Sequence, residues 1–212
     1  MDDVQYRERC RQLPIFPLPR TVLLPNTSLT LHVFEPRYRA LVAHCLERDG
    51  ILGIATLKPG FEEDHGGSPA LFPELGVGQI VGHQPYPDGR SNIVLRSIGS
   101  AHLEEELQLD TPFRIVRGSV PPPNASGLEA ALQGLRVLVL QLGGLSRDAS
   151  EEARRLIQLD GMQLVDALAK RLLEGVDEQR AYLGAARLAD RVALVQDRLA
   201  RFLLPSQIVG EA

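Results

Sequence analysis

The residues of this chain that could bind a metal ion are scattered. Its histidines, His32, His44, His65, His83 and His102, occur singly, and no pair has the spacing that places two imidazoles on one helical face. Neither H-E-x-x-H nor C-x-x-C occurs. The acidic run "EEDHGG" (62–67) is typical of a solvated loop. We therefore predict no metal site and no cofactor.

The chain also lacks the motifs of a nucleophilic or phosphate-binding enzyme. G-x-S-x-G is absent, and Gly-Lys never occurs, so there is no P-loop. The acids of "HLEEEL" (102–107) alternate along a predicted strand, and no low-polarity pocket that would separate their pKa values is predicted. The glycines of "GVGQIVG" (76–82) indicate bulges or close backbone approach. We predict a non-catalytic protein.

The segment "HVFEPRYRALV" (32–42) places an acid, a proline, an arginine and a tyrosine between two apolar stretches, so it could be a catalytic cluster, a binding epitope or a strand-to-helix corner. Alternation over 28–34 predicts a strand, and Pro36 suits the first position of a helix. Glu35 at that helix start would assist the unpaired N–H groups. An apolar stripe follows at helical spacing: Tyr38, Leu41, Val42, Cys45 and Leu46. We interpret Phe34, Glu35, Pro36, Arg37 and Tyr38 as a fold-defining corner, with Arg37 and Arg39 off the stripe.

Composition and charge bound the class of protein. The chain has 212 residues, of which 44% are apolar and 24% charged, as expected for a globular core. Its net charge of −4 gives no reason to expect nucleic acid. No segment is long and apolar enough to span a bilayer, and the acidic start does not resemble a signal peptide. Two cysteines fit a reducing compartment, so we expect a cytoplasmic protein.

The predicted secondary structure changes near residue 121, from short strands before it to helices after it. Strands are predicted over 28–34, 51–57, 76–84, 91–98, 101–108 and 113–120. Pro-Asp-Gly predicts a hairpin between the third and fourth of these strands, and Gly99-Ser100 predicts a second reversal. Antiparallel strands with one early helix indicate a small barrel-like α+β domain.

Helical periodicity replaces the strands after the connector "PPPNASG" (121–127). Ser126 and Glu129 have capping-box spacing, and Gly143-Gly144 would end the first helix. Further starts are predicted at Ser150, Asp160 and Asp177. The final helix is predicted to bury Leu188, Val192, Val195, Leu199 and Phe202. We expect four or five short helices in an all-α bundle.

The segment "LPIFPLPRTVLLPNTSLTLHVFEPRYRALV" (13–42) resembles the start of the Lon protease N-terminal, or substrate-binding, domain. The family's pattern of a "PLFPL" strand, "VLFPG" and "L-x-L-x-I-F-E-P-R-Y" is matched closely, although Asn26 replaces the usual glycine. Similarity continues through "GILGIATLKPG" (50–60), residues 78–107, "PFRIVRGSV" (112–120) and the helical part.

The resemblance implies an α+β protein with a PUA-like small β-barrel and one inserted helix, followed by an all-α helical bundle. The expected divisions are a polar tail (1–12), the barrel domain (13–120), a Pro-rich connector (121–127), the bundle (128–204) and a C-terminal tail (205–212). Because the family's ATPase and proteolytic modules have no counterpart here, we expect a stand-alone form.

The resemblance further implies a non-catalytic module that binds unfolded or tagged polypeptides, or another protein, as an adaptor or regulator in protein quality control. Apolar side chains in turn-rich segments are the candidate peptide contacts: Phe61, Leu71, Phe72 and Tyr86. They would equally serve to cap the barrel ends. An RNA-binding PUA-like protein is the alternative, and the acidic balance and the missing basic stripe argue against it.

Overall fold

The computed structural model describes residues 2–60, 68–144 and 147–203. The chain divides into two compact units: unit 1 is Met1–Pro122 with Gln179–Gly184, and unit 2 is Pro123–Glu178 with Ala185–Ala212. The described residues form a mixed α and β structure with six strands in one sheet and seven helices. No described helix has the length and apolar content to cross a membrane.

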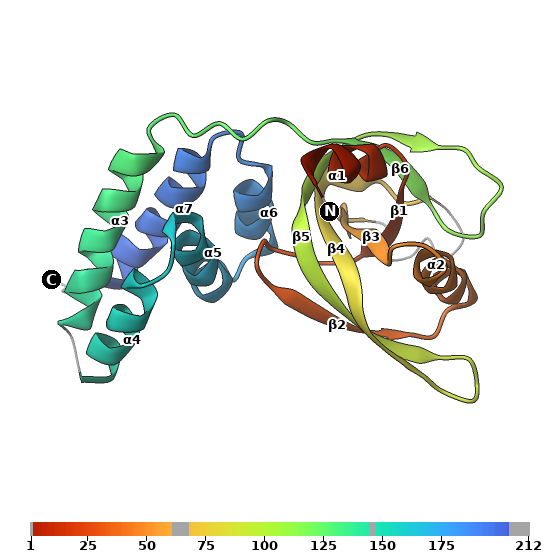
Figure 1. Cartoon of the computed structure of the whole chain (residues 1–212), viewed down its shortest axis with the longest axis horizontal. Coiled ribbons are helices and arrows are strands. Elements are labelled where there is room, and N and C mark those ends of the chain that lie inside the picture. The colour runs from red at the N-terminus through yellow and green to blue at the C-terminus, as the bar shows by residue number, and fades with distance from the viewer. Residues whose placement is uncertain (1, 61–67, 145–146, 204–212) are drawn as a thin grey trace, which may run out of the picture. The chain divides into compact units, whose positions relative to one another are not determined.

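Unit 1 contains all the described strands (Figure 1). Its elements are α1 (Asp3–Cys10), β1 (Leu13–Leu18), β2 (Ser28–Val33), α2 (Pro36–Leu46), β3 (Ile51–Leu57), β4 (Leu71–Pro85), β5 (Ser91–Leu107) and β6 (Ile115–Ser119). The strand order is β2-β5-β4-β3-β1-β6, and β5 also pairs with β6. The pairings β5–β4–β3–β1–β6–β5 therefore return to their starting strand, while β2 lies outside this ring. Pairing is antiparallel except between β1 and β3, which are parallel.

The predicted reversal at Gly99-Ser100 is wrong, because β5 continues through these residues as one long strand. Gly99 pairs with Val77 and Ser100 with Gly76. A Cβ on Gly99 would lie 2.4 Å from the hydroxyl oxygen of Tyr6. This glycine therefore permits the close approach of α1 and does not mark a turn. Residues 1–12, predicted as a polar tail, contain α1, whose Asp2 N-cap forms a capping box with Gln5.

The glycines of β4 fulfil the role predicted for them. A Cβ on Gly76 would lie 2.4 Å from the carbonyl oxygen of Leu23, so the two backbones approach too closely for any side chain. The register of β4 against β5 shifts after Val77 and again after Ile80, which places bulges in this strand.

The interior of unit 1 is divided into two apolar clusters. The first receives the buried face of α2, where Tyr38, Leu41, Val42 and Cys45 are buried as predicted. Leu46 is wrongly included in that stripe: it is the last residue of α2 and is 40% exposed. The second cluster lies under α1, whose Cys10 is buried there.

Unit 2 is helical. It contains α3 (Leu128–Gly143), α4 (Arg147–Ile157), α5 (Gly161–Leu172) and α7 (Leu188–Leu203), whereas α6 (Val176–Gly184) contributes residues to both units. The capping box at Ser126 is wrong: Gly127 is the N-cap of α3, with a positive φ and no side-chain cap. Phe202 is also wrongly assigned to the core, because it lies in the last turn of α7 and is 68% exposed.

Candidate functional site

Aromatic side chains gather on the exposed face of unit 1 where β2 ends. Phe34 is 57% exposed and Tyr86 is 36% exposed. The His32 ring lies between them, 6.0 Å from the Phe34 ring and 6.2 Å from the Tyr86 ring, centroid to centroid. We call His32, Phe34 and Tyr86 the outer aromatic cluster. Three exposed rings offer a large apolar area with polar handles, a composition that suits protein recognition.

Hydrogen bonds through Asn92 link two rings of the cluster, those of His32 and Tyr86. The Asn92 amide nitrogen donates to the Tyr86 hydroxyl oxygen at 2.7 Å. The Asn92 carbonyl oxygen lies 2.7 Å from His32 Nδ1, so this nitrogen is the donor in the neutral ring. His32 and Asn92 are direct partners in the β2–β5 ladder, which places both side chains on one face. The strand pairing therefore places the His32 ring, and Asn92 links it to Tyr86, before any ligand binds.

The fold-defining corner has one buried ring and one exposed ring. Tyr38 is 8% exposed and stacks on Phe16 with ring centroids 4.0 Å apart. Burial raises the pKa of its hydroxyl. Pro36 occupies the first turn of α2 as predicted, but Glu35 does not cap the helix with its side chain. The Glu35 carboxylate instead pairs with Arg37 at 2.8 Å.

Sequence reasoning placed Phe34 with the corner and did not select His32 or Asn92. The signal was present, however. Leu29, Leu31 and Val33 alternate along β2 with the exposed residues Ser28, Thr30 and His32. Extending that period by one step places Phe34 on the outer face.

The predicted peptide contacts lie in different surroundings. Phe61 falls outside the described residues. Leu71 and Phe72 were predicted in a turn-rich segment, but they open β4, because the strand continues through Pro73 and Gly76. Tyr86 alone among the described candidates belongs to the outer aromatic cluster.

The ring of Phe72 is covered by cations. The Arg180 guanidinium lies 3.2 Å from the ring centroid, and the Lys58 ammonium lies 5.8 Å from it. Arg180 also pairs with Glu74 at 3.0 Å, and both side chains are largely buried. Leu71 packs at the border of the second core cluster. Both apolar side chains are thus engaged within unit 1.

The two cysteines offer no nucleophile at neutral pH. Burial raises the pKa of the Cys45 thiol to about 12. Burial also raises that of Cys10 to about 11, against the opposing hydrogen bond from Tyr6. Both thiols therefore stay protonated, and the thiol is the unreactive form. Within residues 2–60, 68–144 and 147–203, no group of three or more His, Cys, Asp and Glu side chains is placed to hold a metal ion.

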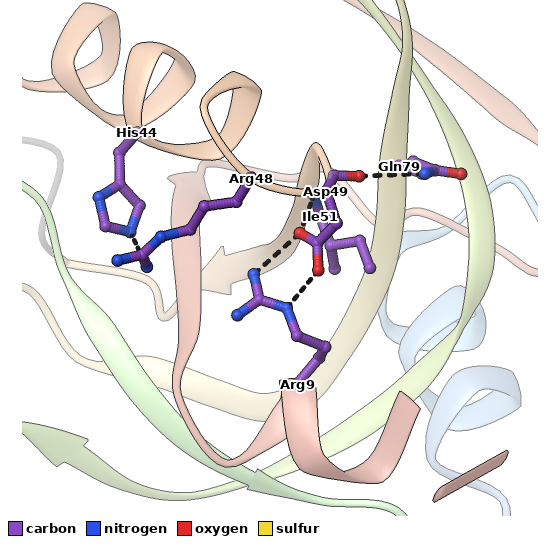
Figure 2. Close-up of polar contacts among 6 residues, drawn as sticks. All are labelled: Arg9, His44, Arg48, Asp49, Ile51 and Gln79. Carbon is purple, nitrogen blue, oxygen red and sulfur yellow. Dashed lines mark hydrogen bonds and ion pairs between the residues drawn. The ribbon is translucent and has the colours of Figure 1, made fainter. Parts of the chain in front are cut away.

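A groove of about 850 Å³ lies between α1, the start of β3 and the middle of β4 and β5, at Ile51, Gln79 and Ile98. Figure 2 shows its polar centre, where the Asp49 carboxylate faces the Arg9 guanidinium at 2.5 Å. The same carboxylate accepts from the Ile51 amide at 3.2 Å, and the Asp49 carbonyl accepts from the Gln79 amide nitrogen at 3.0 Å. Because these groups are already paired with one another, we assign them to holding α1 in place.

The chain matches the family model of the ATP-dependent protease La (LON) substrate-binding domain over residues 12–201. It is 25% identical to Lon protease of Geobacter metallireducens over 197 residues, covering 88% of this chain and 23% of that protein. It is also 25% identical to Lon protease 2 of Myxococcus xanthus over 195 residues, covering 89% of this chain and 23% of that protein. The chain thus spans about a quarter of the length of these relatives.

Solved structures show the same fold. The N-terminal domain of the Mycobacterium avium complex Lon protease superposes with a TM-score of 0.68 at 17% identity, covering 89% of this chain and 98% of that one. A Lon N-terminal domain protein from Xanthomonas campestris gives a TM-score of 0.60 at 22% identity, covering 91% and 96%. The family model extends over both units, whereas α1 lies before its first matched residue. The chain therefore belongs to the LON substrate-binding domain family.

Proposed function

We propose that unit 1 recognises unfolded polypeptide segments through the outer aromatic cluster, as a non-catalytic module of protein quality control. The observation that carries the proposal is the exposure of Phe34, which is 57% open to solvent beside His32 and Tyr86. The ring of strand pairings further supports a PUA-like barrel as the scaffold. An adaptor or regulator role would follow from binding without catalysis.

The matched family supports polypeptide as the ligand class, since its model describes a substrate-binding domain of a protease. Neither the fold nor the relatives support the RNA-binding alternative. The net charge of −4 also disfavours a phosphate-binding surface. Because binding would come mainly from apolar burial, the affinity should depend weakly on salt.

Fluorescence anisotropy tests this function. The ligand is a labelled protein that has been unfolded by reduction and alkylation of its disulfides, and the dissociation constant of its complex with this chain is measured. Phe34→Ser and Tyr86→Ser should each raise the dissociation constant by about fivefold, because each removes a ring that becomes buried on binding. Phe202→Ser is the matched control, since it removes an exposed phenyl ring from unit 2. Equal weakening by all three variants, or no binding by the wild type, would refute the proposed site.

A further inference from the structure

Among the described strands, β2 differs from the rest in its pairing. β1, β3, β4, β5 and β6 each pair with a neighbour on both sides. β2 pairs only with β5, through an unbroken register from Ser28↔Arg96 to Val33↔Ser91. Within the part of the chain that the structure describes, one edge of β2 therefore has no strand partner.

The register determines which backbone groups face that edge. The Ser97 amide donates to the Thr27 carbonyl at 2.9 Å, so the pair immediately before Ser28↔Arg96 is a hydrogen-bonded pair. Hydrogen-bonded and non-hydrogen-bonded pairs alternate along an antiparallel ladder. Leu29, Leu31 and Val33 therefore bond to β5. The amides and carbonyls of Ser28, Thr30 and His32 point to the open edge.

The sequence and register of β2 lack the features that commonly protect an edge strand from another strand. Natural edge strands are blunted by lysine, proline, inward charges or bulges. The sequence of β2 is Ser-Leu-Thr-Leu-His-Val, without lysine, proline or a carboxylate. Its register against β5 contains no bulge, in contrast to the β3–β4, β4–β5 and β5–β6 ladders. An unprotected edge of β-branched and apolar residues is suited to strand addition.

The open edge borders the outer aromatic cluster. Thr30 and His32 share the exposed face of β2, and Phe34 continues it beyond the strand end. In an added antiparallel strand, the residues directly opposite Thr30 and His32 would place their side chains on that same face. Apolar side chains at alternate positions would then meet the rings of His32 and Phe34.

We propose that an extended polypeptide segment with alternating apolar residues binds by adding an antiparallel strand to the open edge of β2. This inference rests on the proposed function and specifies its mode of recognition. The outward amides and carbonyls of Ser28, Thr30 and His32 supply affinity independent of side-chain identity. The outer aromatic cluster supplies the preference for apolar residues. Such a division fits a module that must bind many different unfolded chains.

Backbone-methylated peptides test this mode with the wild-type protein. The probe is a short labelled peptide in which valine alternates with threonine. One derivative is N-methylated at its valines, and the other at its threonines. In antiparallel addition the valine amides face β2, so the valine-methylated peptide should lose binding and the threonine-methylated peptide should retain it. Equal binding of both derivatives and the parent peptide would overturn strand addition and leave side-chain recognition intact.

A single proline substitution in β2 gives the complementary test. Thr30→Pro removes an outward amide without removing a bond to β5, and proline is tolerated at such edge positions. It should weaken peptide binding by about tenfold or more, through the lost bond and the bulk of the ring. Thr30→Val is the matched control, because it keeps the amide and a β-branched side chain.

The outcomes separate the two levels of the proposal. If Phe34→Ser weakens binding but Thr30→Pro binds as well as Thr30→Val, strand addition is wrong and the proposed function stands. If the wild type binds no peptide and no unfolded chain, both are wrong. A third outcome would be that the wild type sediments as a dimer, that Thr30→Pro dissociates this dimer and that no peptide binds. This outcome would assign the β2 edge to a second copy of the chain and overturn the proposal. Should Thr30→Pro fail to fold, the methylated peptides decide.

Discussion

The end of β2 and the first turn of α2 belong to one short motif, yet their aromatic residues have opposite surroundings. Phe34 is 57% exposed beside His32, whereas Tyr38 is 8% exposed against Phe16. The difference arises because the chain changes period between them, from the alternation of a strand to the repeat of a helix. One sequence motif therefore contains both a binding candidate and a core residue.

The largest expected effect in this comparison is on stability. Tyr38→Ala should lower the free energy of unfolding by about 3 kcal/mol, because it leaves a cavity beside Phe16. Phe34→Ser should change it by no more than about 0.5 kcal/mol, because the side chain is mostly solvated. Urea denaturation of both variants measures the contrast. Equal midpoints for the two variants would abolish the distinction between the regions.

A second contrast separates two aromatic regions of unit 1. Phe72 is covered by Arg180 and Lys58, whereas no cation among the described residues lies over a ring of the outer aromatic cluster. Phe72→Ser should cost about 2 kcal/mol of stability, from lost apolar burial and lost cation–π attraction. It should leave the affinity for unfolded protein unchanged at a temperature where the variant is folded.

Phe72→Leu sharpens this second test. It keeps an apolar side chain but removes the π-system, so its stability should lie between those of the wild type and Phe72→Ser. If Phe72→Ser instead weakens polypeptide binding and leaves the melting temperature unchanged, Phe72 belongs to the binding surface and the cations do not shield it.

The sequence predicted local elements better than their pairing. The α2 stripe was found because Tyr38, Leu41, Val42 and Cys45 follow a helical period that packing reinforces. The parallel pairing of β1 with β3 could not be found, because register between distant strands leaves no local signal. Gly99 misled for a related reason: its small size serves the contact with Tyr6, which lies far away in the sequence.

The candidate site was predicted only in part, for the same reason. Tyr86 was selected from its place beside a Pro-Asp-Gly turn. His32 and Asn92 were not, because their hydrogen bond depends on the β2–β5 register. Phe72 was selected as an open apolar residue, but Arg180 covers it from a segment more than a hundred positions later.

The smallest expected effect concerns the rim of α2. The partial burial of His44 lowers the pKa of its imidazole, and the nearby Arg48 guanidinium lowers it further, whereas Glu47 opposes the shift. Arg48 Nη1 lies 2.6 Å from His44 Nε2, a contact that requires the neutral ring (Figure 2). The ring also packs on Phe113, with centroids 5.1 Å apart.

Because the folded protein resists protonation of His44, the unfolded chain takes up this proton more readily below the ordinary histidine pKa of about 6.5. The stability contributed by neutral His44 is therefore present above that pH, and it is lost as the pH falls from there through the lower pKa of His44 in the folded protein. His44→Gln should slightly reduce the fall of the urea midpoint below that pH. Arg48→Gln should raise the His44 pKa, measured by NMR, part of the way toward the ordinary histidine value. The prediction is contradicted if the urea midpoint declines identically with pH in the wild type and His44→Gln, or if the His44 pKa is unchanged in Arg48→Gln. Either result would show that the rim of α2 is as solvated as the end of β2.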